Sequence, residues 1–160
     1  MTRQLLYRWW PTKPALVSEA LFAGTADRWP ARYSGVLRRD LRAFVGALVD
    51  YAQRPDVRSG LLGIMAEVRD ATELRGLDDD LVPELRRSFS ALLEAGRARG
   101  EVRPRVDVDM TLDTLRGAVT AHCVDVTRPR QVVVDHLVQL MTWALAAPAA
   151  AAGRRDTPGR

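Results

Sequence analysis

Apolar residues recur every three or four positions through most of the 160-residue chain, which is the spacing that lines one face of an α-helix. The clearest stripe contains Leu37, Leu41, Phe44, Leu48 and Ala52. A sustained alternation of apolar and polar residues, typical of a half-buried strand, does not occur, and the chain has no Asn-Gly or Asp-Gly hairpin turn. The pattern therefore predicts an all-α protein.

Residues that begin or end helices divide the chain into about six helices. The first is expected to run from Thr12, as N-cap, to about Ala26, because the Trp-Pro pair at positions 29–30 stops it. The second follows Ser34, as N-cap, and ends before Pro55. Both assignments place a hydroxyl at the helix start, where it can accept a hydrogen bond from an unpaired backbone N–H group.

The later helices have equally clear limits. A third opens at Asp56, and its inward stripe contains Leu61, Ile64, Met65 and Val68. The fourth has acidic residues at its start (Asp78–Asp80), Pro83 in its first turn and Gly100 as a left-handed stop. Its stripe is Leu81, Leu85, Phe89, Leu92 and Leu93. The last two helices are expected over 109–126 and 130–146.

These last two helices carry more apolar surface than one core requires. In the final helix only Asp135, Gln139 and Thr142 form a polar strip. A helix that is apolar over more than half its girth is buried on more than one side. We expect the second side to meet the same helices of another copy, although a monomeric bundle with both helices at its centre would also bury them. The expected interface residues are Met110, Gly117, Ala121, Val124, Val134, Val138, Met141 and Leu145.

Composition narrows the class of protein. Lys and Arg number 24 against 20 Asp and Glu, a net charge of +4, which is too small to establish a polyanionic partner. The single cysteine, Cys123, excludes an internal disulfide and fits the cytoplasm. The longest apolar tract is broken by Pro148 and is too short to cross a bilayer, so no membrane association is expected.

The opening segment "LLYRWWPTKPAL", Leu5 to Leu16, carries a recognisable motif. It resembles the end of the recognition helix and the start of the next helix in regulators of the tetracycline-repressor (TetR) family. The matching residues are Leu6, Tyr7, Arg8, Trp10, Thr12, Lys13 and Leu16, whereas Leu5 departs from the family's threonine. The stretch 92–119 is similar to the family's link between its seventh and eighth helices, so the resemblance covers about residues 2–146.

The resemblance implies a domain organisation and DNA contacts. Residues 1–11 would be a remnant of the recognition helix, and 12–147 a TetR-like C-terminal helical bundle that binds an effector and dimerises. Residues 148–160, rich in Ala, Gly, Arg and Pro, are expected from their composition to be a disordered tail. Tyr7 and Lys13 match positions that contact DNA phosphates, and Thr2, Arg3 and Gln4 match the face that reads base edges. Trp10 matches an aromatic residue that packs the recognition helix onto the helix behind it.

Only six residues precede Tyr7, so we expect the given sequence to lack the helices that brace a recognition helix. Either the start is misassigned, because "MTRQLLYR" lies where the family often has "VTRQTLYR", or the truncation is genuine. The first alternative implies a complete repressor that binds operator DNA. The second implies a helical domain that binds ligand or dimerises without specific DNA binding, or a stand-alone interaction protein that pairs with a full-length relative.

The resemblance also implies a small-molecule pocket between the helices, with a lipophilic or aromatic effector. The candidate lining residues are Phe44, Leu48, Met65, Phe89, Leu115, Val119 and His122, although plain core packing is the simpler explanation for each of them. Catalysis is not expected, because His122, Cys123 and Asp125 are adjacent in sequence and a helix points them in different directions. Two histidines and one cysteine do not have the spacing of a structural zinc site, so no metal or cofactor is expected.

Overall fold

The computed structural model describes residues 8–10, 12–22, 29–30, 33–67, 82–124 and 127–147, without the side chains of Lys13, Pro14, Ala15, Ser18, Phe22, Cys123 and Val124. Within these ranges the chain forms six α-helices: α2 Lys13–Phe22, α3 Leu37–Ala52, α4 Pro55–Glu67, α6 Pro83–Ala98, α7 Val108–Val124 and α8 Arg130–Leu145. The all-α prediction is confirmed, and each described helix lies within a few residues of its expected position.

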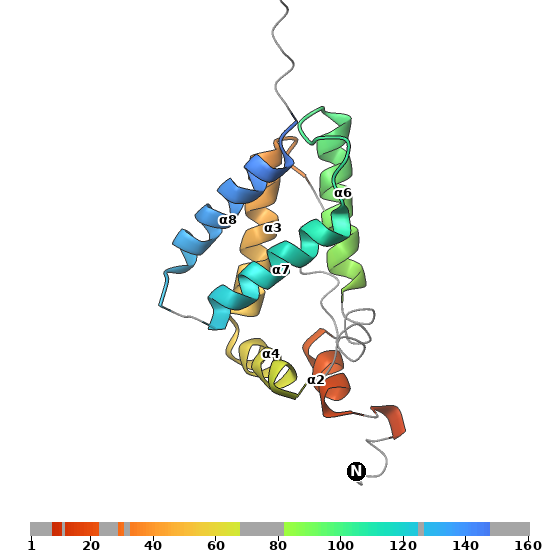
Figure 1. Ribbon diagram of the computed structural model, residues 1–160, viewed down its shortest axis with the longest axis vertical. Helices are drawn as coiled ribbons and strands as arrows, with labels where there is room; N and C mark the ends of the chain where they lie inside the picture. The colour runs from red at the N-terminus through yellow and green to blue at the C-terminus, as the bar shows by residue number, and fades with distance from the viewer. Residues whose placement is uncertain are drawn as a thin grey trace, which may run out of the picture.

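Helix α3 is the centre of the bundle. Ten of its sixteen residues are buried, because α6, α7 and α8 pack around it and α4 contacts its C-terminal end (Figure 1). Helices α7 and α8 cover one side of α3, and α2 and α4 lie together at the lower end of the molecule (Figure 1). The core therefore runs along α3, with one stripe of each neighbouring helix facing it.

Helix α2 is held against α4 by a close approach at a glycine. A Cβ atom at Gly60 would lie 2.7 Å from Cδ1 of Leu21, which is too close for two carbon atoms. The Tyr51 hydroxyl, from the end of α3, also donates a hydrogen bond to the backbone carbonyl of Leu21. These two contacts fix α2 on the lower end of the bundle.

Both ends of α6 agree with the sequence prediction. Pro83 occupies the first turn, where its missing N–H group has no partner to lose. Gly100 has φ +75°, and the N–H group of Glu101 donates to the carbonyl of Gly96 at 2.9 Å. This left-handed glycine stop is confirmed.

The start of α3 differs from the prediction. The N-cap is Val36, which makes no side-chain capping bond, so the assignment of Ser34 as the cap is wrong. Instead, the backbone N–H and the hydroxyl of Ser34 each donate to Oδ1 of Asp40 at 2.6 Å. The carboxylate on the first turn thus reaches back to the chain before the helix, as the acidic residue of a capping box does.

Three helix ends are tied together at the top of the bundle by a structure that we call the terminal clamp, residues 99–103 and 145–147. Arg103 N–H donates to the carbonyl of Leu145 at 3.0 Å, and Ala147 N–H donates to the carbonyl of Glu101 at 2.9 Å. The carboxylate of Glu101 accepts from Leu37 N–H at 3.2 Å. The start of α3, the end of α6 and the end of α8 are therefore connected through one loop.

Candidate effector site and dimerisation surface

An aromatic cluster lies between α3 and α6. Phe44 and Phe89 are fully buried, and their ring centroids are 5.1 Å apart. Trp29 packs on Phe44 at 6.4 Å and on Tyr51 at 5.8 Å, the second contact being edge to face. Such spacings are those of attractive aromatic pairs. The four rings form a continuous apolar wall inside the bundle.

Trp29 brings one unpaired polar atom into this wall. Its side chain is 6% exposed, and among the described residues its indole Nε1–H has no hydrogen-bond acceptor. The segment that carries it is fixed to α6, because Ser88 Oγ donates to the carbonyl of Pro30 at 3.1 Å and the Tyr33 hydroxyl donates to the carbonyl of Ser88 at 2.7 Å.

The structure brings most of the predicted effector residues together. Five of them share the core cluster and are almost completely buried: Phe44, Leu48, Phe89, Leu115 and Val119. His122 is half-buried on α7. Met65 is 60% exposed on α4, so its place on an inward stripe is wrong; the adjacent Ile64 takes the buried position.

Trp29 and Tyr51 belong to the same cluster but were not predicted as effector residues. The sequence pattern predicts only that Trp29 and Pro30 end the first helix, and Tyr51 lies just off the apolar stripe of α3. The signal that could have found Trp29 is its residue type, because tryptophan is highly buried on average.

The outer faces of α7 and α8 are exposed and largely apolar. On α7 the outward positions are Met110, Thr114, Gly117 and Ala121, with Met110 65% exposed. A Cβ atom at Gly117 would meet nothing within 4 Å. On α8 the outward positions are Val132, His136, Gln139, Leu140 and Trp143, with Trp143 70% exposed. Both sets follow helical spacing, and we call them together the outer face.

The predicted interface residues divide between this outer face and the core. Met110, Gly117 and Ala121 are exposed on α7, as a partner surface requires, whereas the side chain of Val124 lies outside the described residues. Four residues of α8 point to α3 instead and are almost completely buried in their own chain: Val134, Val138, Met141 and Leu145. Their assignment to an exposed interface is corrected by the structure, because the other apolar side of α8 is the one that faces outward.

The predicted DNA-contact residues cannot be placed in a site. Thr2, Arg3, Gln4 and Tyr7 lie outside the described residues, and so does the side chain of Lys13. Trp10, which was expected to pack the recognition helix, donates its indole N–H to Oε2 of Glu19 at 2.6 Å. This bond connects residues 8–10 to α2.

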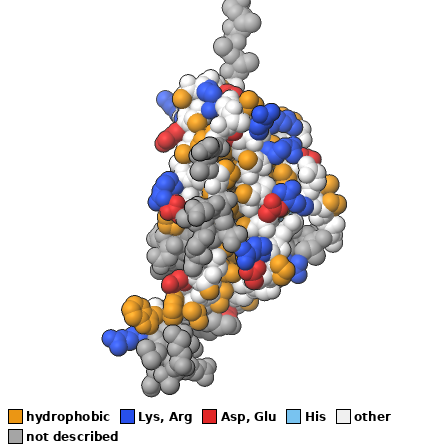
Figure 2. Space-filling view, turned by 180° about the vertical axis from the view of Figure 1, so that it is seen from behind, with side chains coloured by type: hydrophobic (Ala, Val, Ile, Leu, Met, Phe, Trp, Pro, Cys, Tyr) orange, Lys and Arg blue, Asp and Glu red, His pale blue; other side chains and the backbone are white. Residues whose placement is uncertain are grey.

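Ion pairs join α8 to α3 at the edge of their contact. Arg130 forms a bidentate pair with Asp50, in which Nη2 lies 2.7 Å from Oδ2, and this hydrogen bonding lowers the pKa of Asp50. Arg42 lies 2.5 Å from Asp135, whose pKa is lowered by hydrogen bonds from Gln131 and then Arg42. Acidic and basic side chains are interspersed in the same way on the opposite side of the molecule (Figure 2).

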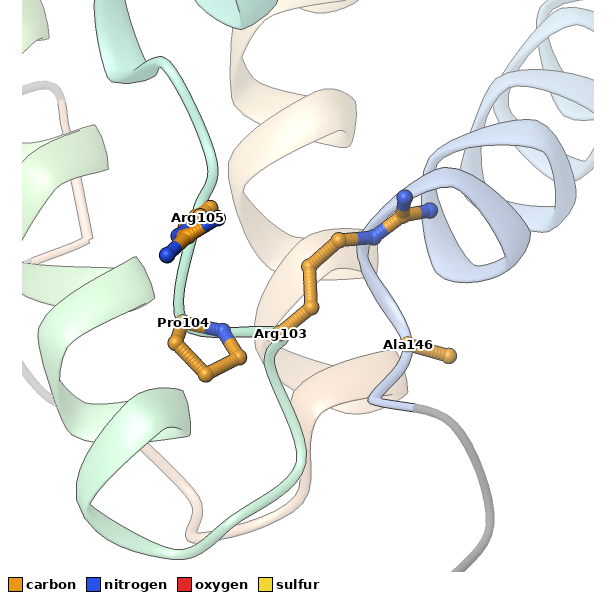
Figure 3. A pocket seen from close by; sticks show the side chains of 4 residues that line it. All are labelled: Arg103, Pro104, Arg105 and Ala146. Atoms are coloured by element: carbon orange, nitrogen blue, oxygen red, sulfur yellow. The ribbon is translucent and has the colours of Figure 1, made fainter.

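A pocket of about 410 Å³ lies beside the terminal clamp, lined by Arg103, Pro104, Arg105 and Ala146. The two arginines point in different directions (Figure 3). Arg103 donates to the backbone carbonyl of Ala144 at the end of α8. Because the guanidinium groups do not converge, this pocket lacks the paired cationic contacts that hold a carboxylate or phosphate.

Within the described part of the chain, no three His, Cys, Asp or Glu side chains gather as a metal site would require. None of its helices combines the length and the apolar character needed to span a bilayer.

Fold and surface define a class: an all-α domain with a buried aromatic centre and an outward apolar face on its last two helices. The sequence profile described as "Tetracyclin repressor-like, C-terminal domain" matches residues 33–141. The chain therefore belongs to the tetracycline-repressor (TetR) family, and the matched region is that family's C-terminal domain.

Individual relatives agree with this assignment. The HTH-type transcriptional regulator AqdR of Rhodococcus erythropolis is 30% identical over 114 residues, which is 71% of this chain and 55% of AqdR. The chain thus spans little more than half the length of this relative. Among solved structures, the TetR transcriptional regulator SCO0520 of Streptomyces coelicolor has TM-score 0.54 and 24% identity over 93% of this chain and 83% of its own. A tetR-family regulatory protein from Rhodococcus RHA1 has TM-score 0.60 and 14% identity, with coverages of 92% and 82%.

Proposed function

We propose that this chain is the effector-binding and dimerising part of a TetR-family transcriptional repressor. In this proposal two copies associate through α7 and α8, and a small lipophilic molecule binds next to the aromatic cluster. The operator is read by a helix-turn-helix to which Thr2, Arg3, Gln4, Tyr7 and Lys13 belong. The observation that carries the proposal is the outer face, because it presents apolar residues of two helices to solvent.

The composition of the outer face favours association with a second copy. Met110, Leu140 and Trp143 are large apolar residues exposed on it, while Gly117 and Ala121 leave α7 nearly flat. Flat, small-residue helices allow helix axes to approach closely, and the larger side chains of the facing helices fill the remaining space. A two-fold axis would let each copy provide both kinds of surface.

Burial of Trp143 in the proposed interface would stabilise the dimer by several kcal/mol. An aromatic side chain buries about 150–250 Å², so covering the exposed 70% of Trp143 removes roughly 100–175 Å² from water. At about 25 cal/mol per Å² this contributes about 3–4 kcal/mol per copy. Two copies of this contact are a substantial part of what a stable dimer requires after its association entropy is subtracted.

The effector part of the proposal is supported by the aromatic wall and by its position. Tyr51 of this cluster bonds the carbonyl of Leu21 in α2, the helix that would lead toward a DNA-reading domain. Helix α3, which carries Phe44 and Tyr51, also packs on α7, which would contact the partner subunit. A ligand bound there can change DNA affinity only if it prefers one arrangement of α2 over another. The family's repressor logic requires such a coupling between two sites.

Light scattering on the purified chain tests the dimer. We expect twice the chain mass of 17.8 kDa for the wild type and a single-chain mass for Trp143→Glu, because the charge would be buried in the interface. Met65→Glu is the matched control, since Met65 is a similarly exposed apolar residue outside the outer face, and it should leave the mass unchanged. A folded wild-type monomer at micromolar concentration would contradict the proposal.

A further inference from the structure

The most unusual group in the core is the unpaired indole N–H of Trp29. Only 6% of Trp29 is exposed, and no described residue accepts a hydrogen bond from its Nε1–H. An unsatisfied buried donor costs roughly 1–3 kcal/mol, and most buried polar groups in proteins are paired. An unpaired donor at this position therefore calls for an acceptor that the described residues do not provide.

The surrounding polar groups are already engaged with one another. The carbonyl of Leu21 accepts from the Tyr51 hydroxyl, and the carbonyl of Pro30 accepts from Ser88 Oγ at 3.1 Å. The Tyr33 hydroxyl donates to the carbonyl of Ser88. These bonds hold the segments around Trp29 in place, and within the described part of the chain they leave its Nε1–H without an acceptor.

We propose that the Trp29 indole N–H is the polar anchor of the effector site and donates a hydrogen bond to a neutral acceptor oxygen of a flat, apolar ligand. This inference rests on the effector site proposed above and specifies its chemistry. The rings of Tyr51 and Phe44, which already contact Trp29, would pack against the ligand. A ketone, lactone or amide carbonyl on an aromatic ring system has the required combination.

A neutral acceptor fits better than an anion. Among the described residues, the cation that lies over a ring of this cluster is Arg54, 5.9 Å from the centroid of Tyr51. Arg54 already forms a bidentate pair with Asp56, with Nη2 at 2.7 Å from Oδ2. Burying an unpaired carboxylate beside Trp29 would cost far more than one hydrogen bond returns, whereas a carbonyl needs only the donor that is present.

The site would also connect the ligand to α2. Trp29 lies in the segment between α2 and α3, and Tyr51 of the same cluster holds the carbonyl of Leu21 in α2. A ligand that repositions the Trp29 and Tyr51 rings therefore acts on two connections of α2 to α3, in addition to the packing of α2 on α4. This is the differential contact that effector coupling requires.

The test compares two probes that differ in one acceptor, 1-indanone and indane, by ¹⁵N NMR of the full chain. The chain has four tryptophans, so four indole N–H signals are expected, and Trp9→Phe, Trp10→Phe and Trp143→Phe assign that of Trp29 by elimination. We expect 1-indanone to shift the Trp29 signal downfield with saturation. Because a net hydrogen bond contributes about 1 kcal/mol, 1-indanone should bind roughly five- to tenfold more tightly than indane.

Replacement of the donor separates anchoring from simple apolar packing. Trp29→Phe should keep indane affinity within a few-fold and remove the preference for 1-indanone. Trp9→Phe, at a tryptophan that is 73% exposed, is the control that should retain the preference, and circular dichroism checks that each variant is folded. Two outcomes would refute Trp29 as the anchor but leave an effector site: the preference for 1-indanone survives in Trp29→Phe, or both probes bind the wild type equally without moving the Trp29 signal. If neither probe gives a saturable shift, the anchor is also refuted, and the dimer measurement still decides the proposed function.

Discussion

The carboxylate of Asp40 is expected to be the most important polar group for the stability of the bundle. Asp40 is 4% exposed, accepts two hydrogen bonds of 2.6 Å from Ser34, and lies 3.5 Å from Nη2 of Arg99. It thus joins the chain before α3, the first turn of α3 and the end of α6. Asp40→Ala removes all three interactions at once.

The size of the loss follows from what each partner can still do. Ser34 is exposed, so its two donors can bond to water, and Arg99 keeps its hydrogen bonds to Glu101 at 2.8 and 3.0 Å. Loss of a helix-terminal acceptor costs about 0.5–2 kcal/mol, and loss of a hydrogen bond to a charged group costs about 1.5–3 kcal/mol. We therefore expect Asp40→Ala to lower the free energy of unfolding by about 2–3 kcal/mol and Tm by roughly 5–10 °C.

Urea unfolding followed by circular dichroism measures this loss, at one protein concentration so that any association contributes equally. Ser34→Ala, which removes only the hydroxyl donor, should lose about 1 kcal/mol. The control is Asp113→Ala, which breaks an exposed pair with Arg116 within α7 and should have little effect. If Asp40→Ala and Asp113→Ala agree within about 0.5 kcal/mol, the role assigned to the Asp40 carboxylate is refuted.

Two further predictions concern packing and pH. A Cβ atom at Gly96 would lie 2.6 Å from Cγ2 of Val102, so Gly96→Ala should destabilise the protein by about 1–3 kcal/mol. Gly63→Ala, whose Cβ would meet nothing within 4 Å, should instead stabilise it by up to about 1 kcal/mol. Equal urea midpoints for the two variants would contradict this prediction. The hydrogen bonds from Arg130 lower the pKa of Asp50 in the folded protein. The ionised Asp50 therefore stabilises the fold fully above its unfolded pKa, near 3.8, and this stabilisation is lost as the pH falls through the lower folded pKa. The urea midpoint of Asp50→Asn should therefore lie below that of the wild type at pH 7 and match it at about pH 2; a difference that persists in acid would show that charge is not its cause.

The sequence predicts the helices well because their ends are determined by local chemistry. Pro83 and Gly100 act within one turn, and the stripe from Leu37 to Ala52 is apolar on one side only, so it has one way to face a core. The start of α3 was misplaced because Ser34 and Asp40 are both plausible helix-terminal residues. Which of the two provides the acceptor depends on Arg99 and Glu101, about sixty residues away.

The candidate site was less predictable for a related reason. Both sides of α8 are apolar, so its periodicity cannot decide whether Val138 or Trp143 faces α3. That choice is made by the shape of α3 and by pairs such as Arg42 with Asp135, which are long-range contacts. In the same way, Ile64 and Met65 are equally apolar neighbours, and only the docking of α4 buries one of them. Trp29 joins the cluster through tertiary packing that no local pattern encodes.

The terminal clamp has a mechanical consequence. Its hydrogen bonds hold the end of α8 beside the start of α3, so a rotation of α8 about the clamp would displace the far end of α8 most. Helix α8 has 16 residues, or roughly 24 Å at about 1.5 Å per residue, so a rotation of only about 5° moves its far end by roughly 2 Å. Arg130, at that far end, is paired with Asp50 of α3, so such a rotation would first have to break this ion pair.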